Sequence, residues 1–280
     1  MNASLKIDLH THSNCSDGAL SPAELVAQAA AAGVHVMALT DHDSTDGLEH
    51  ARRAADEFSV HLVPGVEISC LWRAQAIHVI GLWVDPCGAT LKTLLRSQAE
   101  LRRTRMRSIC RRLSNARLPG DMLLAAVEAK GGVPTRTHLA NAMVASGLVA
   151  RTADAFSKYL GKGKAGHVAI EWPALQQTIG AILSAGGVAV LAHPGRYPIS
   201  GGARRRLLDE FTAAGGTALE VVSGGNGAQH VESCTVLALK YGLAGSVGSD
   251  FHGPQLAWNP LGRSLKLPDG ITPVWRGQLP

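Results

Sequence analysis

Five short segments rich in histidine and carboxylate residues constrain this chain most, because each lies in or just after an apolar stretch typical of a β-strand. Imidazole and carboxylate groups are common ligands of divalent metals. A parallel α/β barrel gathers the C-terminal ends of its strands around one pocket. The sequence therefore predicts a barrel that holds a polynuclear metal site. The segments are residues 8–12, residues 40–43, Glu67 with His78, residues 193–194 and residues 249–252.

Strand-like and helix-like stretches alternate along most of the chain. This order predicts a mostly parallel sheet with right-handed crossovers. Seven strands that return metal ligands to one end fit a closed barrel better than an open sheet. Strands are expected at 7–10, 36–40, 61–69, 77–84, 188–192, 218–222 and 244–248, and helices at 22–33, 45–58, 173–185, 202–214 and 227–241.

Residues 99–167 interrupt this alternation with a basic, helical pattern. They hold 13 Lys or Arg and 4 Asp or Glu, a net charge of +9 in a chain whose total is +5. Helices are expected at 101–116, 121–130 and 138–146. We predict a barrel domain made of 1–98 and 168–280 and an insertion domain at 99–167 that binds an anionic substrate. A solvated basic helix face without a ligand is the alternative.

Several classes of protein fit the sequence poorly. The chain has no apolar run of the ~20 residues that cross a bilayer, and its first residues lack the apolar core of a signal peptide. Its five cysteines form no C-x-x-C pair, which favours reduced thiols. The protein is expected to be cytoplasmic and to have no membrane partner. Residues 254–280 show no pattern beyond a role in closing the barrel.

The motifs in these segments resemble those of the PHP (polymerase and histidinol phosphatase) superfamily. The resemblance covers residues 6–85 and 187–252 in order. It implies a distorted seven-stranded (βα) barrel with three divalent ions, Mn²⁺, Zn²⁺ or Fe. The motifs are D-L-H-T-H at 8–12, S-D-G at 16–18, T-D-H-D at 40–43, G-V-E-I-S at 65–69, H-V-I-G at 78–81, A-H-P-G at 192–195 and G-S-D-F-H at 248–252.

The resemblance also implies which residues bind each ion. His10, His12, Glu67 and Asp250 would bind the first. Glu67 would bridge to a second ion, completed by His78 and His193, and Asp17, His42 and His252 would bind the third. Some family members have His where Asp17 stands here, and the harder carboxylate favours Mn²⁺ or Mg²⁺ over Zn²⁺. Asp8, Asp41 and Asp43 are expected to orient the ligand imidazoles.

A mechanism follows from this ligand set. Two ions that share Glu67 would share a water whose lowered pKa yields hydroxide near neutral pH, and this hydroxide would attack phosphorus. Asp250 is expected to orient or deprotonate the water. The catalytic residues implied are Glu67, Asp250 and His193.

The substrate is expected to contact both the insertion and the barrel loops. Arg136 is the strongest candidate, because it sits at a predicted helix N-terminus and its guanidinium can bind phosphate through two hydrogen bonds. The full set is Arg102, Arg103, Arg136 and His138 in the insertion and Arg196 and Asn226 in the barrel.

The length, the basic insertion and the S-D-G and T-R-T-H motifs most resemble stand-alone family members that act on nucleotides. This implies removal of the 3′-phosphate from nucleoside 3′,5′-bisphosphates, such as adenosine 3′,5′-bisphosphate. A 5′→3′ exonuclease on short RNA is the main alternative. A histidinol-phosphatase-like enzyme and a non-catalytic nucleic-acid-binding module are less favoured. The sequence favours no particular oligomeric state.

Overall fold

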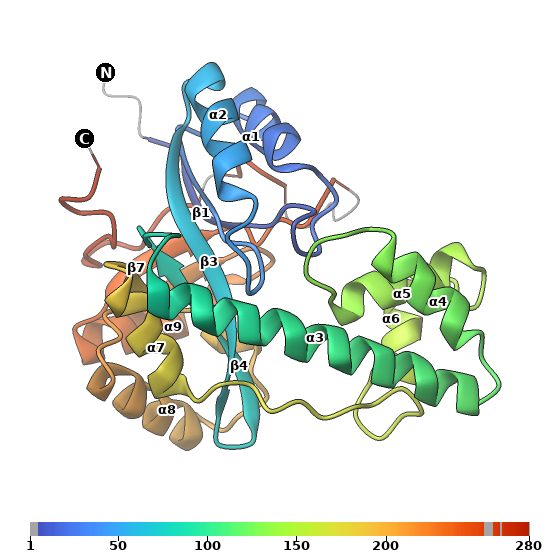
Figure 1. The fold of residues 1–280 in the computed structure, drawn as a ribbon. Coiled ribbons are helices and arrows are strands. Elements are labelled where there is room, and N and C mark those ends of the chain that lie inside the picture. The colour runs from blue at the N-terminus through green and yellow to red at the C-terminus, as the bar shows by residue number, and fades with distance from the viewer. Residues whose placement is uncertain (1–4, 255–259, 264, 280) are drawn as a thin grey trace.

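The computed structural model describes residues 5–254, 260–263 and 265–279. In these residues one seven-stranded sheet follows chain order from β1 to β7 (Figure 1). Neighbouring strands are parallel except that β4 is antiparallel to both β3 and β5. The predicted α/β class and the seven mostly parallel strands are thus confirmed, whereas the antiparallel pairing of β4 was not expected. The strands are β1 (Ile7–Thr11), β2 (Val36–Leu39), β3 (His61–Trp72), β4 (Gln75–Leu82), β5 (Val188–Leu191), β6 (Ala218–Ser223) and β7 (Ala244–Gly248).

Backbone hydrogen bonds bring the two edges of the sheet together into a nearly closed barrel. Asp250 N donates to His10 O at 2.7 Å, and His12 N donates to Phe251 O at 2.9 Å. These bonds join the end of β1 to the segment that follows β7. The predicted barrel is confirmed, and its closure lies in the segments that were expected to bind metal.

The hairpin of β3 and β4 is longer than predicted. Trp72 pairs with Gln75, so a two-residue turn connects the strands, and Arg73 in that turn has a φ of 55°. Arg73 and Ala74 are not the Asn-Gly or Asp-Gly residues that usually mark such turns in a sequence. The prediction therefore ended β3 three residues early.

Helices outside the sheet cover the barrel (Figure 1). A capping box at Ser21 begins the first of them, since Glu24 N donates to Ser21 Oγ at 3.3 Å and Ser21 N donates to Glu24 Oε2 at 2.8 Å. Side chains from every strand pack inside the barrel in one buried cluster that includes Leu9, Val63 and Val190. The covering helices are α1 (Pro22–Ala31), α2 (Leu48–Phe58), α7 (Leu175–Ser184), α8 (Gly201–Ala213) and α9 (Ala228–Tyr241).

Part of the C-terminal stretch 254–280 covers the N-terminal end of the barrel. Gly245 N donates to Thr272 O at 2.8 Å, and Val274 N donates to Gly245 O at 2.9 Å. Val274 also joins the cluster inside the barrel. The described part of this stretch therefore closes the barrel as expected, whereas 255–259, 264 and 280 lie outside the described residues.

The insertion is built on one long helix. α3 (Ala89–Asn115) begins twelve residues before the predicted start at 101 and runs from the barrel into the insertion (Figure 1). Leu91 and Leu95 at its start belong to the barrel core, whereas Ile109 and Leu113 belong to a separate core with Leu139. A domain boundary at residue 99 therefore cuts through α3, and the proposed division remains a prediction. The other helices here are α4 (Gly120–Glu128), α5 (Arg136–Ala145), α6 (Thr152–Ala155) and a π-helical turn, η1 (Phe156–Leu160).

No helix among the described residues is both long and apolar enough to cross a membrane.

Replacing Leu113 by Ala should destabilise the insertion. Leu113 is fully buried in the insertion core, and a buried Leu→Ala change costs about 2–5 kcal/mol. Urea unfolding followed by circular dichroism would measure the loss. Leu239→Ala on α9 is the matched control, because Leu239 is 56% exposed and should change stability little. Equal effects of the two substitutions would contradict an independent insertion core.

Candidate metal centre

All nine predicted metal ligands come together at the C-terminal end of the barrel strands. His10 lies in β1, and His12 follows that strand directly. Asp250 and His252 both lie in the segment after β7. Asp17 reaches the site from the loop that follows β1, and the other ligands come from β3, β4 and the segments after β2 and β5. The nine are His10, His12, Asp17, His42, Glu67, His78, His193, Asp250 and His252.

A first group of four buried ligands consists of Glu67 and the three residues near its Oε2, which are His10, His12 and Asp250. His10 Nε2 lies 3.3 Å and His12 Nε2 lies 3.4 Å from this oxygen. The same two nitrogens lie 3.4 Å and 3.2 Å from Asp250 Oδ1. Their ligand atoms all fall within 4.8 Å of one another, which is the spacing of groups that can share one ion.

A second group faces the other oxygen of Glu67. His78 Nδ1 and His193 Nε2 each lie 2.9 Å from Glu67 Oε1. The two oxygens of one carboxylate thus point at different groups of imidazoles. This geometry suits a carboxylate that bridges two ions.

A third group contains His12, Asp17, His42 and His252. Asp17 Oδ1 lies 3.3 Å from His252 Nε2 and 3.8 Å from His42 Nε2. The other nitrogen of His42, Nδ1, lies 2.9 Å from Glu67 Oε2. His42 therefore stands between groups, and the assignment of each ligand to one ion remains a prediction.

The donor atoms of these groups fit divalent metal ions. Several of them, including His10 Nε2, His12 Nε2, Asp17 Oδ1 and Glu67 Oε2, are buried and have no hydrogen-bond partner among the described residues. Buried polar atoms in folded proteins are normally paired or coordinate a metal. Nitrogen and oxygen donors without thiolate suit Mn²⁺, Mg²⁺, Fe²⁺ and Zn²⁺.

Glu67 and His12 have protonation states that suit metal binding, whereas neighbouring carboxylates outweigh burial and raise the pKa of His10 and His252, so these two rings would release a proton on binding an ion. Burial alone would raise the pKa of Glu67, but the imidazoles of His42, His78 and His10 hold it well below its usual range. The carboxylate therefore stays ionised. Burial lowers the pKa of His12 to about 3, so its ring is neutral at pH 7, which is the form that binds a metal.

Glu220 on β6 supports this centre and was missed in the sequence. Its Oε1 lies 2.9 Å from His10 Nδ1, and its Oε2 accepts a hydrogen bond from His193 N at 2.6 Å. The contact with Nδ1 orients the ring so that Nε2 faces Glu67. A carboxylate inside an apolar strand is the signal that pointed to Glu67, and the same signal marks Glu220.

The prediction that Asp8, Asp41 and Asp43 orient the ligand imidazoles is wrong. Their carboxylates instead accept hydrogen bonds from backbone amides, hydroxyls and an arginine, and so fix the loops that carry the ligands. The reason is that their hydrogen bonds are made with neighbouring segments, and none is made with a ligand imidazole in the described part of the chain. The donors are Ser249 N and His10 N for Asp8, Ser13 N and Oγ and Ser16 Oγ for Asp41, and Ser69 N, Gln98 Nε2 and Arg102 Nε for Asp43.

Two candidate substrate-binding residues contact the protein's own groups. Arg102 is only 8% exposed, its Nε lies 2.6 Å from Asp43 Oδ2, and its guanidinium lies 4.8 Å from the ring centre of Trp172. Arg196 forms an ion pair with Asp250 and donates to Gly224 O at 2.8 Å. Arg196 is therefore at the metal centre, whereas Arg102 joins α3 to the loop that follows His42.

The other four candidates lie around the site. Arg103 is exposed on α3, and Arg136 is exposed at the start of α5. His138 Nδ1 accepts a hydrogen bond from Thr135 N at 3.1 Å and caps α5. The side-chain nitrogen of Asn226 is buried and has no hydrogen-bond partner among the described residues. A substrate role for any of them remains a prediction.

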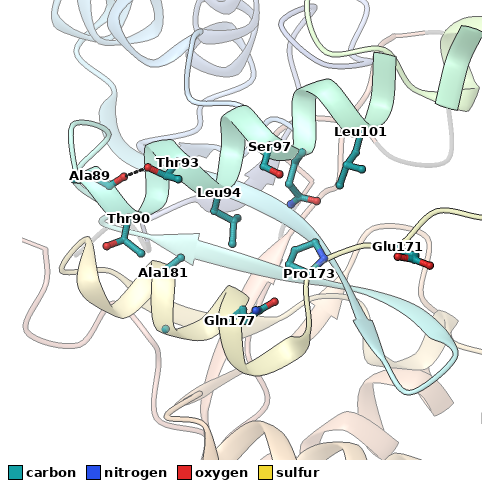
Figure 2. Close-up of a pocket in the computed structure, with 12 residues that line it drawn as sticks. Ala89, Thr90, Thr93, Leu94, Ser97, Leu101, Glu171, Pro173, Gln177 and Ala181 are labelled. Carbon is teal, nitrogen blue, oxygen red and sulfur yellow. Dashed lines mark hydrogen bonds between the residues drawn. The ribbon is translucent and has the colours of Figure 1, made fainter. Parts of the chain in front are cut away.

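A large cavity lies apart from the metal centre. It has a volume of about 850 Å³ and lies between α3 and α7, where Leu94, Pro173 and Gln177 line it (Figure 2). None of the nine ligands lines it. A second cavity of about 430 Å³ lies on the other flank of α3 and reaches Asp43, beside His42.

Comparison with known proteins agrees with this geometry. The chain matches the PHP domain family over residues 8–159. It is 42% identical over 270 residues to a 5′-3′ exoribonuclease of Haemophilus influenzae, which covers 96% of this chain and 98% of that protein. The chain belongs to the PHP family. The resemblance stated from the motifs is thus confirmed.

A named protein and a solved structure, both from Chromobacterium violaceum, are also similar to this PHP chain. It is 39% identical over 272 residues to a 3′,5′-nucleoside bisphosphate phosphatase, covering 96% of this chain and 95% of that one. The solved structure of an amidohydrolase with bound sulfate superimposes with a TM-score of 0.92 at 38% identity, over 97% of this chain and 95% of that one. The PHP fold therefore extends over nearly the whole chain, insertion included.

Substituting Glu220 by Gln should weaken metal binding. The amide keeps the shape of the side chain but loses the charge that orients His10, and losing such a contact typically costs about 10–100-fold in metal affinity. Titration of the metal-free protein with Mn²⁺, followed by calorimetry, would measure the change. Glu57→Gln on the exposed face of α2 is the control and should bind as the wild type does. Wild-type affinity in Glu220→Gln would contradict the orienting role.

Proposed function

We propose that this PHP protein hydrolyses phosphoesters and removes the 3′-phosphate from nucleoside 3′,5′-bisphosphates. The observation that carries the proposal is the buried carboxylate of Glu67, whose two oxygens face separate groups of metal ligands. The similar phosphatase of C. violaceum supports the same substrate class. We infer three divalent ions per chain. Mn²⁺ is favoured because Asp17 makes the third group harder, and Mg²⁺, Fe²⁺ and Zn²⁺ are the alternatives.

Divalent ions bound by these ligands would supply a water of lowered pKa and neutralise charge on the phosphoryl oxygens. The reaction forms a bond from the water oxygen to phosphorus and breaks the bond from phosphorus to O3′, which leaves with a proton. The products are phosphate and a nucleoside 5′-monophosphate. No serine or cysteine nucleophile is needed.

Asp250 is placed to orient the attacking water. Its Oδ1 faces His10 and His12, and its Oδ2 pairs with Arg196. Burial alone would raise the pKa of Asp250, but His10, His252 and Arg196 hold it well below its usual range. The carboxylate is therefore ionised and fixed from both sides, as a group that orients the water requires, and its low pKa disfavours a role as the base. Glu67 and His193 position the site around it.

Two arginines of the insertion are suited to the second phosphate. Burial and the nearby guanidiniums of Arg136 and Arg102 lower the pKa of Arg105 to about 10. Arg105 Nε donates to Val168 O, and neither Arg105 nor Arg136 has an ion pair with a carboxylate in the described part of the chain. A phosphate between these two side chains would relieve the repulsion of their like charges.

A 5′→3′ exonuclease is the second candidate function. The H. influenzae relative supports it, and its chemistry is nearly the same. Cutting the first phosphodiester of a 5′-phosphorylated RNA breaks the same bond, from phosphorus to the O3′ of the first nucleoside. A 3′,5′-bisphosphate is then the shortest form of the same substrate.

The protein should release phosphate from adenosine 3′,5′-bisphosphate in the presence of Mn²⁺. Asp17→Ala and His252→Ala should each reduce turnover to background, because each removes a ligand of the third group. His61→Ala, at an exposed position on β3, should leave turnover unchanged. Circular dichroism would show that all three variants fold. Absence of phosphate release, with rapid turnover of an unrelated phosphoester, would contradict the proposed bisphosphate substrate. Unchanged activity of both Asp17→Ala and His252→Ala would contradict the inference that a third ion takes part in the reaction.

Arg136→Ala should weaken the binding of substrates that carry the second phosphate. We expect KM for adenosine 3′,5′-bisphosphate to rise about tenfold or more, the effect of losing a hydrogen bond between charged groups. KM for adenosine 3′-monophosphate should hardly change, because that substrate has no 5′-phosphate. Arg151→Ala, an exposed arginine of the same insertion that pairs with Asp154, is the control. Equal losses on both substrates would contradict the assignment.

A further inference from the structure

The cavity of about 430 Å³ on one flank of α3 has the composition of an anion-binding groove. One wall is α3, and the other wall is the loop between β2 and α2 together with the glycine turn before α5. Its lining is mostly polar. The residues are Asp43, Ser44, Thr45, Asp46, Lys92, Leu95, Arg96, Ala99, Arg103, Gly132 and Val133.

The α3 wall of this groove presents three positive charges. Lys92, Arg96 and Arg103 are four and seven residues apart, so they lie on the same face of the helix. All three are exposed, and of the ion pairs in the described residues only one involves them, at 3.9 Å between Arg103 and Glu100. Over roughly 16 Å of helix, these cations offer repeated contacts to a chain of phosphates.

The opposite wall does not cancel this charge. Asp43 is already neutralised by Arg102, whose Nε lies 2.6 Å from its Oδ2. Only Asp46 remains as an unpaired acid among the lining residues. Ser44 and Thr45 add hydroxyls that can donate to phosphate oxygens. The groove therefore has a net positive charge and suits an anion.

The groove is lined by segments that adjoin two of the metal ligands. Asp43 directly follows the ligand His42. At the other end, Val133 N donates to Cys15 O at 3.0 Å, so the glycine turn rests on the loop that carries the ligand Asp17. These two segments link the groove to the ligands His42 and Asp17, so a strand held in the groove would lie beside the segments that carry them.

The larger cavity on the other flank of α3 lacks this chemistry. Leu94, Leu101 and Pro173 line it, and its one charged side chain among the described residues is Glu171 (Figure 2). A polyanion would be repelled there. The two flanks of α3 therefore differ in charge, and only the flank with Lys92 and Arg96 suits a nucleic acid.

We propose that this groove binds the RNA strand beyond the phosphate that is cleaved, an inference that rests on the proposed function. Water adds to phosphorus, the bond to O3′ breaks, and the phosphate stays on the departing strand. The products are a nucleoside 5′-monophosphate and an RNA one nucleotide shorter that again begins with a 5′-phosphate. The groove would hold that shortened strand beside the metal centre for the next cleavage.

The double variant Lys92→Ala/Arg96→Ala tests the groove in the full-length, Mn²⁺-loaded enzyme. On a 5′-phosphorylated RNA of ten nucleotides, KM should rise severalfold. The slope of log(kcat/KM) against log salt should become shallower by about 0.7 for each lost phosphate contact, or about 1.4 in total. Hydrolysis of adenosine 3′,5′-bisphosphate should keep wild-type kinetics. Arg111→Ala, an exposed arginine of α3 outside the groove, is the matched control.

The outcomes separate the two levels of the proposal. A wild-type salt slope and KM on RNA in the double variant would overturn the groove, and so would a wild-type enzyme that hydrolyses the bisphosphate but not the RNA. Equal losses on bisphosphate and RNA would also overturn it, because the residues would then serve the shared site. A wild-type enzyme that hydrolyses neither substrate would overturn the proposed function, and the groove with it.

Discussion

The buried charge of Glu67 is the interaction on which the rest of the structure depends. A fully buried carboxylate is costly unless its charge is compensated, and here six histidines, His10, His12, His42, His78, His193 and His252, gather around it or its neighbours. Two backbone hydrogen bonds fix its position, since Glu67 N donates to Asp41 O at 3.2 Å and Asp43 N donates to Glu67 O at 2.9 Å. Glu67 therefore fixes the position of β3 relative to the loop that carries the ligand His42.

Two strand residues that are not ligands, Glu220 and Gly248, hold the ligands of this centre in place. Glu220 links His10 to the backbone of His193, and so couples β1, β5 and β6. The neighbouring strand leaves no room for a larger residue at Gly248, because a Cβ there would lie 2.2 Å from that of His10 and 2.8 Å from Glu220 Oε1. The close packing that requires glycine at position 248 therefore also keeps His10 and Glu220 in the positions that orient the metal ligands.

The sequence predicted the parts of this molecule that follow from local pattern. The strand ends that carry His10, His193 and Asp250 were recognisable because apolar runs end in polar, metal-binding side chains. Glu220 was missed because its strand ends without a ligand, so its carboxylate read as one more polar residue. The early start of α3 and the burial of Arg102 were also missed, since the first depends on packing of Leu91 and Leu95 against the barrel core and the second on a contact with Asp43, far away in the chain. Local patterns carry no information about such partners.

The single helix shared by barrel and insertion has a mechanical consequence. α3 is continuous from Ala89 to Asn115, and midway along it Gln98 and Arg102 hold the carboxylate of Asp43, which has a φ of 51° and follows His42. Gln98 and Arg102 therefore connect the insertion to the segment that carries the candidate ligand His42. A change in the direction of α3 would be transmitted to that segment through the same two side chains.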